Sequence, residues 1–331
     1  MIDYRSVGLN EDDLKKMYKW MDLGRKIDER MWLLNRSGKI PFVISCQGQE
    51  ATQIGMAYAM EEGDISSPYY RDLAFVTYLG MTPLDTMLSA FAKRDDINSG
   101  GKQMPSHFSQ KSLGILSQSS PVGTQILHAV GAALSLKMDK KPNIAMSTVG
   151  EGSSNQGDFH EGLNFAGVHN LPFICVIENN KYAISVPDNL QYGAEKLSDR
   201  ALGYGMHGQQ VDGNDPIAMY KAMKEARERA INGEGATLIE AMCTRMTPHS
   251  SDDDDKYRSQ EIRDGLKDLD CNLRFKNYLL EQGIIDQDWL DALEQEHKEI
   301  VNKATKEAEQ APYPDAQETY THVYDEGSIE A

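Results

Sequence analysis

The stretch IAMSTVGEGSSNQGDFHEGLNFAGVHNLPFICVIENN, residues 144–180, contains the pattern that decides the fold. Its first six residues form an apolar run of the kind found in buried strands, and a glycine-rich turn follows at 150–158. Residues 159–169 have helical spacing, and residues 173–178 form a second apolar run. A strand, a helix and a strand in this order are typical of a parallel α/β sheet, whose ligands bind beyond the carboxyl ends of the strands.

An acidic side chain and an amide side chain follow these two strands directly. Glu151 lies between two glycines after the first strand, and Asn180 follows the second strand. Because adjacent parallel strands end at the same edge of a sheet, we expect the two side chains to meet there. Carboxylate, amide and backbone carbonyl oxygens suit a Mg²⁺ ion that holds phosphate oxygens. A GxG turn alone also fits an ordinary strand-to-helix connection, whereas both elements at this spacing are a much more specific signal.

The rest of the chain predicts one compact domain over residues 1–331. A helical segment at about 1–40 precedes the sheet, and an acidic helical segment at about 259–331 follows it. The irregular stretch 97–121 is long for a connection within a domain and is therefore expected to be functional. Further helices are predicted at 11–37, 48–62, 83–93 and 216–232, and a further strand is predicted at 237–243.

Composition excludes several classes of partner. The chain of 331 residues carries a formal net charge of −17, which opposes binding to nucleic acids and to anionic membranes. Residues 1–246 account for −4 of this charge and residues 247–331 for −13, so the acidity lies mostly beyond the predicted site. No apolar run approaches the roughly 18 residues of a membrane span, and no secretory signal is recognisable. Four isolated cysteines do not suggest a disulfide framework. We therefore expect a reduced, cytoplasmic protein.

Several motifs occur in order along the chain. They are FVISCQGQE (42–50), SGGKQMPSHF (99–108), SQSSPVGTQ (117–125), GEGSSNQGDFHEGLNFA (150–166), ENNKYAIS (178–185), YGMHGQQVDGND (204–215) and RMTPHSSDDDDKYR (245–258). With these motifs the chain resembles the alpha subunits of the thiamine-diphosphate-dependent decarboxylase components of 2-oxo acid dehydrogenases. The GEG and FVISCQGQE segments are most similar to the branched-chain (2-oxoisovalerate) type. The resemblance extends from about residue 10 to residue 310.

The resemblance implies a role for individual residues. A guanidinium suits phosphate oxygens physically, although a surface ion pair between Arg71 and Asp72 is the alternative interpretation of that arginine. His249 matches the active-site histidine of the family, which would donate a proton to the reacting carbonyl oxygen or stabilise it, and His107 matches a second histidine near the cofactor. The remaining implied contacts are Mg²⁺ ligation by Glu151, Asn180 and the carbonyl of Tyr182, and cofactor binding by Tyr70, Arg71, Ser120, Val122, Gly152, Ser153 and His249.

Three further features leave alternatives open. Ser119, Pro121, Thr124 and Gln125 match a monovalent-cation site that would hold K⁺, and a Ser-Pro turn capped by the threonine explains the same residues. Glu178 stands where branched-chain relatives often carry an arginine. A carboxylate there cannot bind diphosphate, and pyruvate-type relatives also carry Glu at this place. The acidic run 252–255 fits either a solvated charge run or a loop over the active site that orders with cofactor.

The resemblance also implies that this chain is half of an enzyme. In two-chain relatives a beta subunit supplies the carboxylate that activates the cofactor, which implies an α₂β₂ heterotetramer. The acyl product would pass to a lipoyl domain on an acyltransferase core. Alternative functions are a pyruvate or acetoin dehydrogenase alpha subunit, a different phosphate-binding α/β enzyme, and a non-catalytic protein that keeps the fold.

Overall fold

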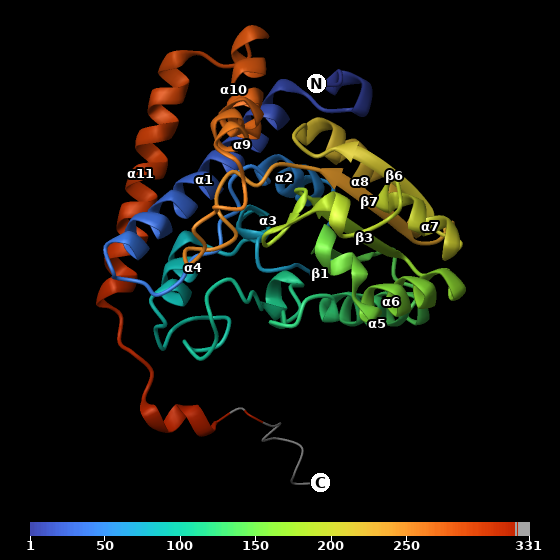
Figure 1. Ribbon diagram of the computed structural model, residues 1–331, viewed down its shortest axis with the longest axis horizontal. Helices are drawn as coiled ribbons and strands as arrows, with labels where there is room; N and C mark the ends of the chain where they lie inside the picture. Colours follow the sequence, from blue (N-terminus) through green and yellow to red (C-terminus); the bar gives the residue numbers. More distant parts are fainter. Residues whose placement is uncertain (322, 324–331) are drawn as a thin grey trace.

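A five-stranded sheet forms the centre of the molecule (Figure 1). The computed structural model describes residues 1–321 and residue 323. Neighbouring strands follow the order β1-β2-β3-β7-β6, and every pair in this sheet is parallel. The predicted α/β class with a mostly parallel sheet is therefore confirmed. The strands are β1 (Ile65–Ser67), β2 (Ala145–Gly150), β3 (Phe173–Asn179), β6 (His207–Asp212) and β7 (Thr237–Met242).

Both faces of the central strands are buried. Along β3, Phe173, Cys175 and Ile177 belong to one hydrophobic cluster, and the alternate residues Ile174 and Val176 belong to another. Successive side chains of a strand point to opposite faces, so this alternation divides the core between two layers of helices. It also explains why β2 and β3 appear as continuous apolar runs in the sequence.

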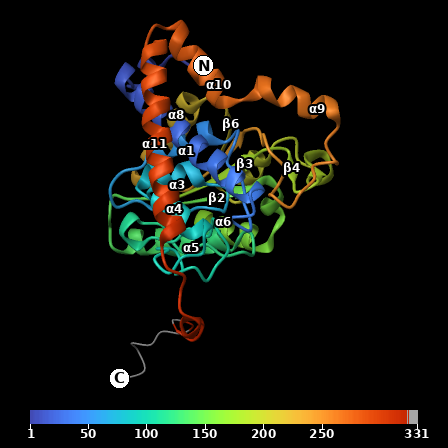
Figure 2. The same ribbon diagram turned by 90° about the vertical axis from the view of Figure 1, so that its left-hand side faces the viewer.

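Two layers of helices cover the sheet, and a third lies outside one of them (Figures 1 and 2). Helices α5 (Thr124–Met138), α6 (Gly157–Val168) and α7 (Arg200–Gly203) cover one face, and α8 (Pro216–Ile231), α2 (Glu50–Tyr58) and α3 (Leu73–Leu79) cover the other. The outer layer comprises α1 (Glu11–Arg36), α4 (Pro83–Ala90) and α11 (Gln287–Gln310).

Helix α1 begins and ends where its sequence predicts. Its amino terminus is a capping box, in which the Asn10 side chain accepts from the backbone of Asp13 and the Asp13 side chain accepts from the backbone of Asn10. The helix ends at Arg36, and Gly38 adopts a left-handed φ of 72° just beyond it. The predicted helices at 48–62, 83–93 and 216–232 are present in α2, α4 and α8.

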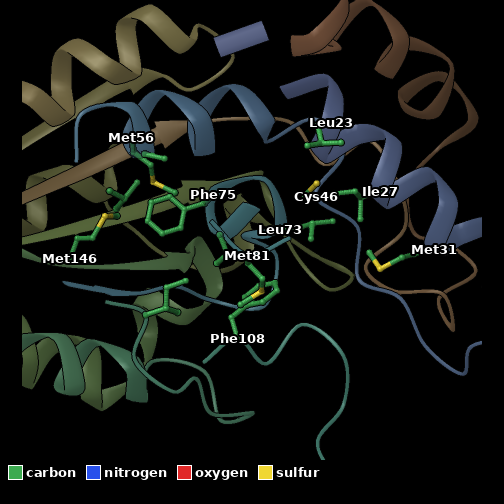
Figure 3. Packing of buried hydrophobic residues seen from close by; sticks show 14 of the residues in the cluster. Leu23, Ile27, Met31, Cys46, Met56, Leu73, Phe75, Met81, Phe108 and Met146 are labelled. Atoms are coloured by element: carbon green, nitrogen blue, oxygen red, sulfur yellow. The ribbon is translucent and has the colours of Figure 1, made fainter. Parts of the chain in front are cut away.

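The irregular stretch 97–121 is anchored in the core by two apolar side chains, Phe108 and Ile115. Phe108 is 3% exposed and belongs to the same buried cluster as Phe75 and Met81 (Figure 3). This anchoring holds one end of the loop against the body, while other parts of the loop reach the edge of the sheet.

The acidic C-terminal segment is helical as far as the structure describes it. It contains α9 (Gln260–Gly265), α10 (Cys271–Glu281) and α11, and the short 3-10 helix Ala316–Tyr320 follows. Residues 322 and 324–331 of the predicted segment and domain lie outside the described residues. Among the helices that are described, none combines the length and the apolar character needed to cross a bilayer.

Candidate active site

A cavity of about 440 Å³ opens at the carboxyl ends of β2 and β3. All eleven residues that the sequence suggested for catalysis, cofactor binding or Mg²⁺ ligation line it. The four residues suggested for a monovalent cation do not. The lining residues are Phe42, Ile44, Tyr69, Tyr70, Arg71, Met104, His107, Ser120, Val122, Gly150, Glu151, Gly152, Ser153, Asn180, Tyr182, Ala183, Ile184 and His249.

Glu151 and Asn180 meet at the edge of the sheet, as the spacing predicts. Strands β2 and β3 pair in parallel register, and the backbone N–H of Asn180 donates to Glu151 Oε2 at 3.3 Å. The Gln191 side chain donates to Oε1 at 3.2 Å, a contact that no motif indicated. Glu151 is only 1% exposed, and burial raises the pKa of its carboxyl group. Within the described residues it forms no ion pair, so a buried carboxylate here lacks a positive partner.

Gly152 allows two loops to pack closely beside Glu151. A Cβ atom at this position would lie 2.5 Å from the Cβ atom of Ala183, which is far inside van der Waals contact. Ala183 follows Tyr182, whose carbonyl oxygen already accepts from Arg245 Nη1 at 3.1 Å. A carbonyl oxygen has a second lone pair, so this contact leaves the oxygen able to bind a metal.

Arg71 is a buried cation on the other side of the cavity. Its guanidinium donates to the carbonyl oxygens of Ser45 at 2.7 Å and His249 at 3.2 Å. Its Nε has no partner, and within residues 1–321 and 323 no carboxylate lies within ion-pair distance of it. The residue is 2% exposed. The alternative of a surface ion pair with Asp72 is therefore wrong, because the Asp72 carboxylate instead accepts from the Tyr69 backbone and the Thr148 hydroxyl.

A contact with Arg71 defines the tautomer of His249. Its Nδ1 lies 3.3 Å from Arg71 Nη2, and because a guanidinium can only donate, Nδ1 is the acceptor. The ring proton is then on Nε2. Burial, with Arg71 and Arg245 nearby, lowers the pKa of His249 to about 4. His249 is therefore neutral near pH 7, with an Nε2–H group available as a donor.

His107 has the opposite arrangement of protons. Its Nδ1 lies 3.0 Å from the carbonyl oxygen of Met104, so Nδ1 carries the hydrogen. Its Nε2 then accepts from the Ser120 hydroxyl at 2.6 Å. The two histidines that line the cavity are thus held as different tautomers by different neighbours.

The acidic run 252–255 divides between structure and solvent. Asp253 accepts from the His249 backbone at 2.8 Å and from the Tyr257 hydroxyl, and Asp255 is buried in an ion pair with Arg258 at 2.6 Å. Asp252 and Asp254 are exposed. The interpretation of the run as a solvated charge run therefore holds for only two of its four residues, because the other two hold the loop that carries His249.

The side chains of three of the residues suggested for K⁺ are hydrogen-bonded to other groups of the chain. The Ser119 hydroxyl donates to the carbonyl of Pro121 at 2.9 Å, and the Thr124 hydroxyl donates to Asp158 at 3.3 Å. The Gln125 side chain bridges the N–H of Gly123 and the carbonyl of Thr148. Gly123 precedes α5 without a side-chain cap, so the alternative of a threonine cap is wrong.

Glu178 takes no part in the cavity wall. The carboxyl group of Glu178 is fully buried. Its Oε2 accepts from the Gln53 side chain at 3.3 Å and from the Tyr69 hydroxyl at 3.1 Å. Among the described residues, neither its Oε1 nor the Oδ1 of Asp72 has a hydrogen-bond partner. Burial and the neighbouring Asp72 raise the pKa of Glu178 well above its usual value, and burial raises that of Asp72 to about 6. Both buried acids therefore keep their protons to a higher pH than usual.

Comparison with known proteins identifies the family of the chain. A sequence model described as dehydrogenase E1 component matches residues 18–317. The chain is 56% identical to the 2-oxoisovalerate dehydrogenase subunit alpha of Bacillus subtilis (strain 168), covering 97% of this chain and 98% of that one. It is 37% identical to the 3-methyl-2-oxobutanoate dehydrogenase subunit alpha of Mycobacterium tuberculosis (strain ATCC 25618 / H37Rv), covering 96% and 84%. It is 38% identical to the pyruvate dehydrogenase E1 component subunit alpha of Bacillus subtilis (strain 168), covering 92% and 80%. The chain belongs to the dehydrogenase E1 component family.

Proposed function

We propose that this chain is the alpha subunit of a branched-chain 2-oxo acid dehydrogenase decarboxylase, working with thiamine diphosphate and Mg²⁺. One observation carries the proposal. A buried acid, Glu151, and a buried base, Arg71, face the same cavity, and neither has a charged partner among the described residues. A buried charge without a partner is unfavourable. A Mg²⁺ ion at Glu151 bridged to a diphosphate at Arg71 would supply both missing charges.

The donor set fits this cation. Glu151 offers a carboxylate oxygen, Asn180 an amide oxygen and Tyr182 a backbone carbonyl, which are the hard oxygen ligands that Mg²⁺ prefers. Ser153 and the close approach at Gly152 would lie against the diphosphate, with Tyr70 and Arg71 opposite. Ser120 and Val122 would face the rest of the cofactor. Glu178 cannot contribute a contact, since its side chain is buried beneath the wall.

The chain's own residues orient the substrate and handle protons. When bound, thiamine diphosphate supplies the carbanion that adds to the 2-oxo group and then takes up the electrons released with CO₂. His249 Nε2–H would donate to the carbonyl oxygen as negative charge develops on it. The Nδ1–H group of His107 donates to the carbonyl oxygen of Met104. Its Nε2, beside the Ser120 hydroxyl, would therefore face the substrate carbonyl group as well.

An apolar wall favours a branched substrate. Phe42, Ile44, Met104 and Ile184 line the cavity together, and burying each additional methyl or methylene group is worth about 0.8 kcal/mol. The higher identity to the 2-oxoisovalerate enzyme than to the pyruvate enzyme, 56% against 38%, supports the same choice. A pyruvate or acetoin dehydrogenase subunit is the alternative.

The site needs a partner chain. Glu151 is the one carboxylate among the cavity residues that the structure describes, and the proposal assigns it to Mg²⁺. The carboxylate that activates the cofactor must then come from a beta subunit, in an α₂β₂ assembly that delivers acyl groups to a lipoyl-bearing acyltransferase core. Four buried thiols without disulfides fit a cytoplasmic location. Ser119, Pro121, Thr124 and Gln125 remain the proposed K⁺ ligands.

Turnover and binding by the reconstituted αβ complex test the proposal. Higher kcat/KM on 3-methyl-2-oxobutanoate than on pyruvate is expected, and the reverse preference would exclude the branched-chain assignment. Calorimetric titration should show that thiamine diphosphate binds only with Mg²⁺. Glu151→Ala should lower this affinity at least about a hundredfold, because losing even an outer-shell partner of a metal ligand costs about tenfold to a hundredfold. Unchanged binding in that variant would contradict the assigned metal site.

A further inference from the structure

Asp96 is a buried carboxylate held entirely by hydrogen bonds from its own loop. It is 6% exposed. Oδ1 accepts from the backbone N–H and the side chain of Asn98, at 3.1 and 2.9 Å. Oδ2 accepts from the backbone N–H and hydroxyl of Ser99 and from the N–H of Gly101, at 3.2, 3.0 and 3.1 Å. No basic side chain within the described residues pairs with Asp96. We refer to residues 96–101 as the Asp96 turn.

The Asp96 turn holds the chain on both sides of His107. On one side, the Ser99 hydroxyl accepts from the N–H groups of Lys102 and Gln103 at 3.1 and 3.0 Å. On the other side, Asn98 Oδ1 accepts from the N–H of Ser109 at 2.9 Å. His107 lies between these two attachment points, and its own Nδ1 is fixed on the next residue after Gln103, Met104.

The backbone around the turn has little freedom to move. A Cβ atom at Gly101 would lie 2.7 Å from the carbonyl oxygen of Ala92, so the turn packs directly against the end of the preceding helix. Ser106, immediately before His107, has a left-handed φ of 68°. Such a conformation is unfavourable for serine and persists only where the surroundings enforce it. The hydrogen bonds of the Asp96 turn anchor the chain on both sides of this residue, at Gln103 and Ser109.

We infer that Asp96 is a positioning residue for His107 and Met104 in the proposed reaction. The inference rests on the proposed function, because it assigns Asp96 a role through two residues of that site. Asp96 itself does not line the cavity. Its five hydrogen bonds fix where the loop enters the cavity, and therefore where the His107 ring meets Ser120.

Asp96→Asn tests the inference, with Asp95→Asn as the matched control. An asparagine at 96 replaces one acceptor oxygen with an NH₂ group that faces other donors. Asp95 is adjacent, largely exposed and paired only with Arg94 at 3.0 Å. In the αβ complex we expect Asp96→Asn to lower kcat about tenfold or more, since small misplacements of reacting groups are costly. Asp95→Asn should remain within twofold of wild type, and Mg²⁺-dependent cofactor affinity should change little in either variant.

A double-mutant cycle with His107→Phe separates positioning from general destabilisation. If Asp96 acts through His107, Asp96→Asn should cause less than a twofold further loss of kcat in the His107→Phe background. Multiplicative losses would overturn the inference. Tryptic cleavage after Lys102, which needs no activity, should be at least fivefold faster in Asp96→Asn than in Asp95→Asn. Equal cleavage of the two variants would overturn the inference. A complex that turned over no 2-oxo acid would instead contradict the proposed function, and the cleavage comparison would still test the inference.

Discussion

Replacing Gly152 with alanine is expected to weaken cofactor binding through a neighbouring loop. The added Cβ would lie 2.5 Å from Ala183 Cβ, whereas carbon atoms normally approach to about 3.5–4.0 Å. One of the two segments must therefore move by about 1 Å. Ala183 follows Tyr182, the proposed carbonyl ligand of Mg²⁺, and a displacement of this size can cost about a hundredfold in a site that depends on geometry.

Calorimetric titration of the αβ complex with thiamine diphosphate and Mg²⁺ measures this effect. We expect the affinity of Gly152→Ala to fall about tenfold to a hundredfold, or about 1.4–2.7 kcal/mol. Gly157→Ala is the matched control, because a Cβ there has no neighbour within 4 Å. It should bind like the wild type.

A second substitution shows whether the clash causes the loss. Removing the Cβ atom of Ala183 leaves the nearest remaining contacts of the new Cβ at 3.5 and 3.6 Å, which are ordinary distances. The double variant Gly152→Ala, Ala183→Gly should therefore recover most of the affinity. If Gly152→Ala bound like Gly157→Ala, or if the double variant recovered nothing, the reasoning would be refuted.

Three further predictions concern charges buried at the site. Arg71→Met should lower the cofactor affinity about a hundredfold in the same titration. The free subunit should remain as stable as wild type in urea, because the substitution removes a buried charge that has no partner. The lowered pKa of His249 means that the unfolded chain binds more protons between pH 6.5 and about 4. The unbound subunit should therefore lose stability as the pH falls through this range, with a smaller slope in thermal unfolding of His249→Gln. The raised pKa values of Glu178 and Asp72 change stability in the opposite direction. The folded state retains protons that the unfolded chain loses as the pH rises above about 4, so these two acids lower the stability as the pH rises. In urea titrations, the stability of Glu178→Gln relative to wild type should therefore be greater at pH 8.5 than at pH 5. The same relative stability at both pH values would argue against the raised pKa of Glu178.

Local patterns in the sequence predicted three of the five strands, β2, β3 and β7, and the meeting of Glu151 with Asn180. The apolar runs of β2 and β3 and the turn between them indicate adjacent parallel strands, and this adjacency alone brings Glu151 to Asn180. Strand β6 was not predicted, because HGQQVD lacks an apolar run and forms an exposed edge of the sheet. The single domain over residues 1–331 stays a prediction.

The tertiary structure decided the electrostatic state of the site. The sequence could not show that Arg71 is buried without an acid, that burial and Asp72 raise the pKa of Glu178, or that Arg71 fixes the tautomer of His249, 178 positions along the chain. Strand patterns and turn residues depend on neighbours a few positions away, so the amino-acid order determines them directly. The charge and hydrogen-bonding state of a buried group depends on partners that only folding brings within a few ångströms.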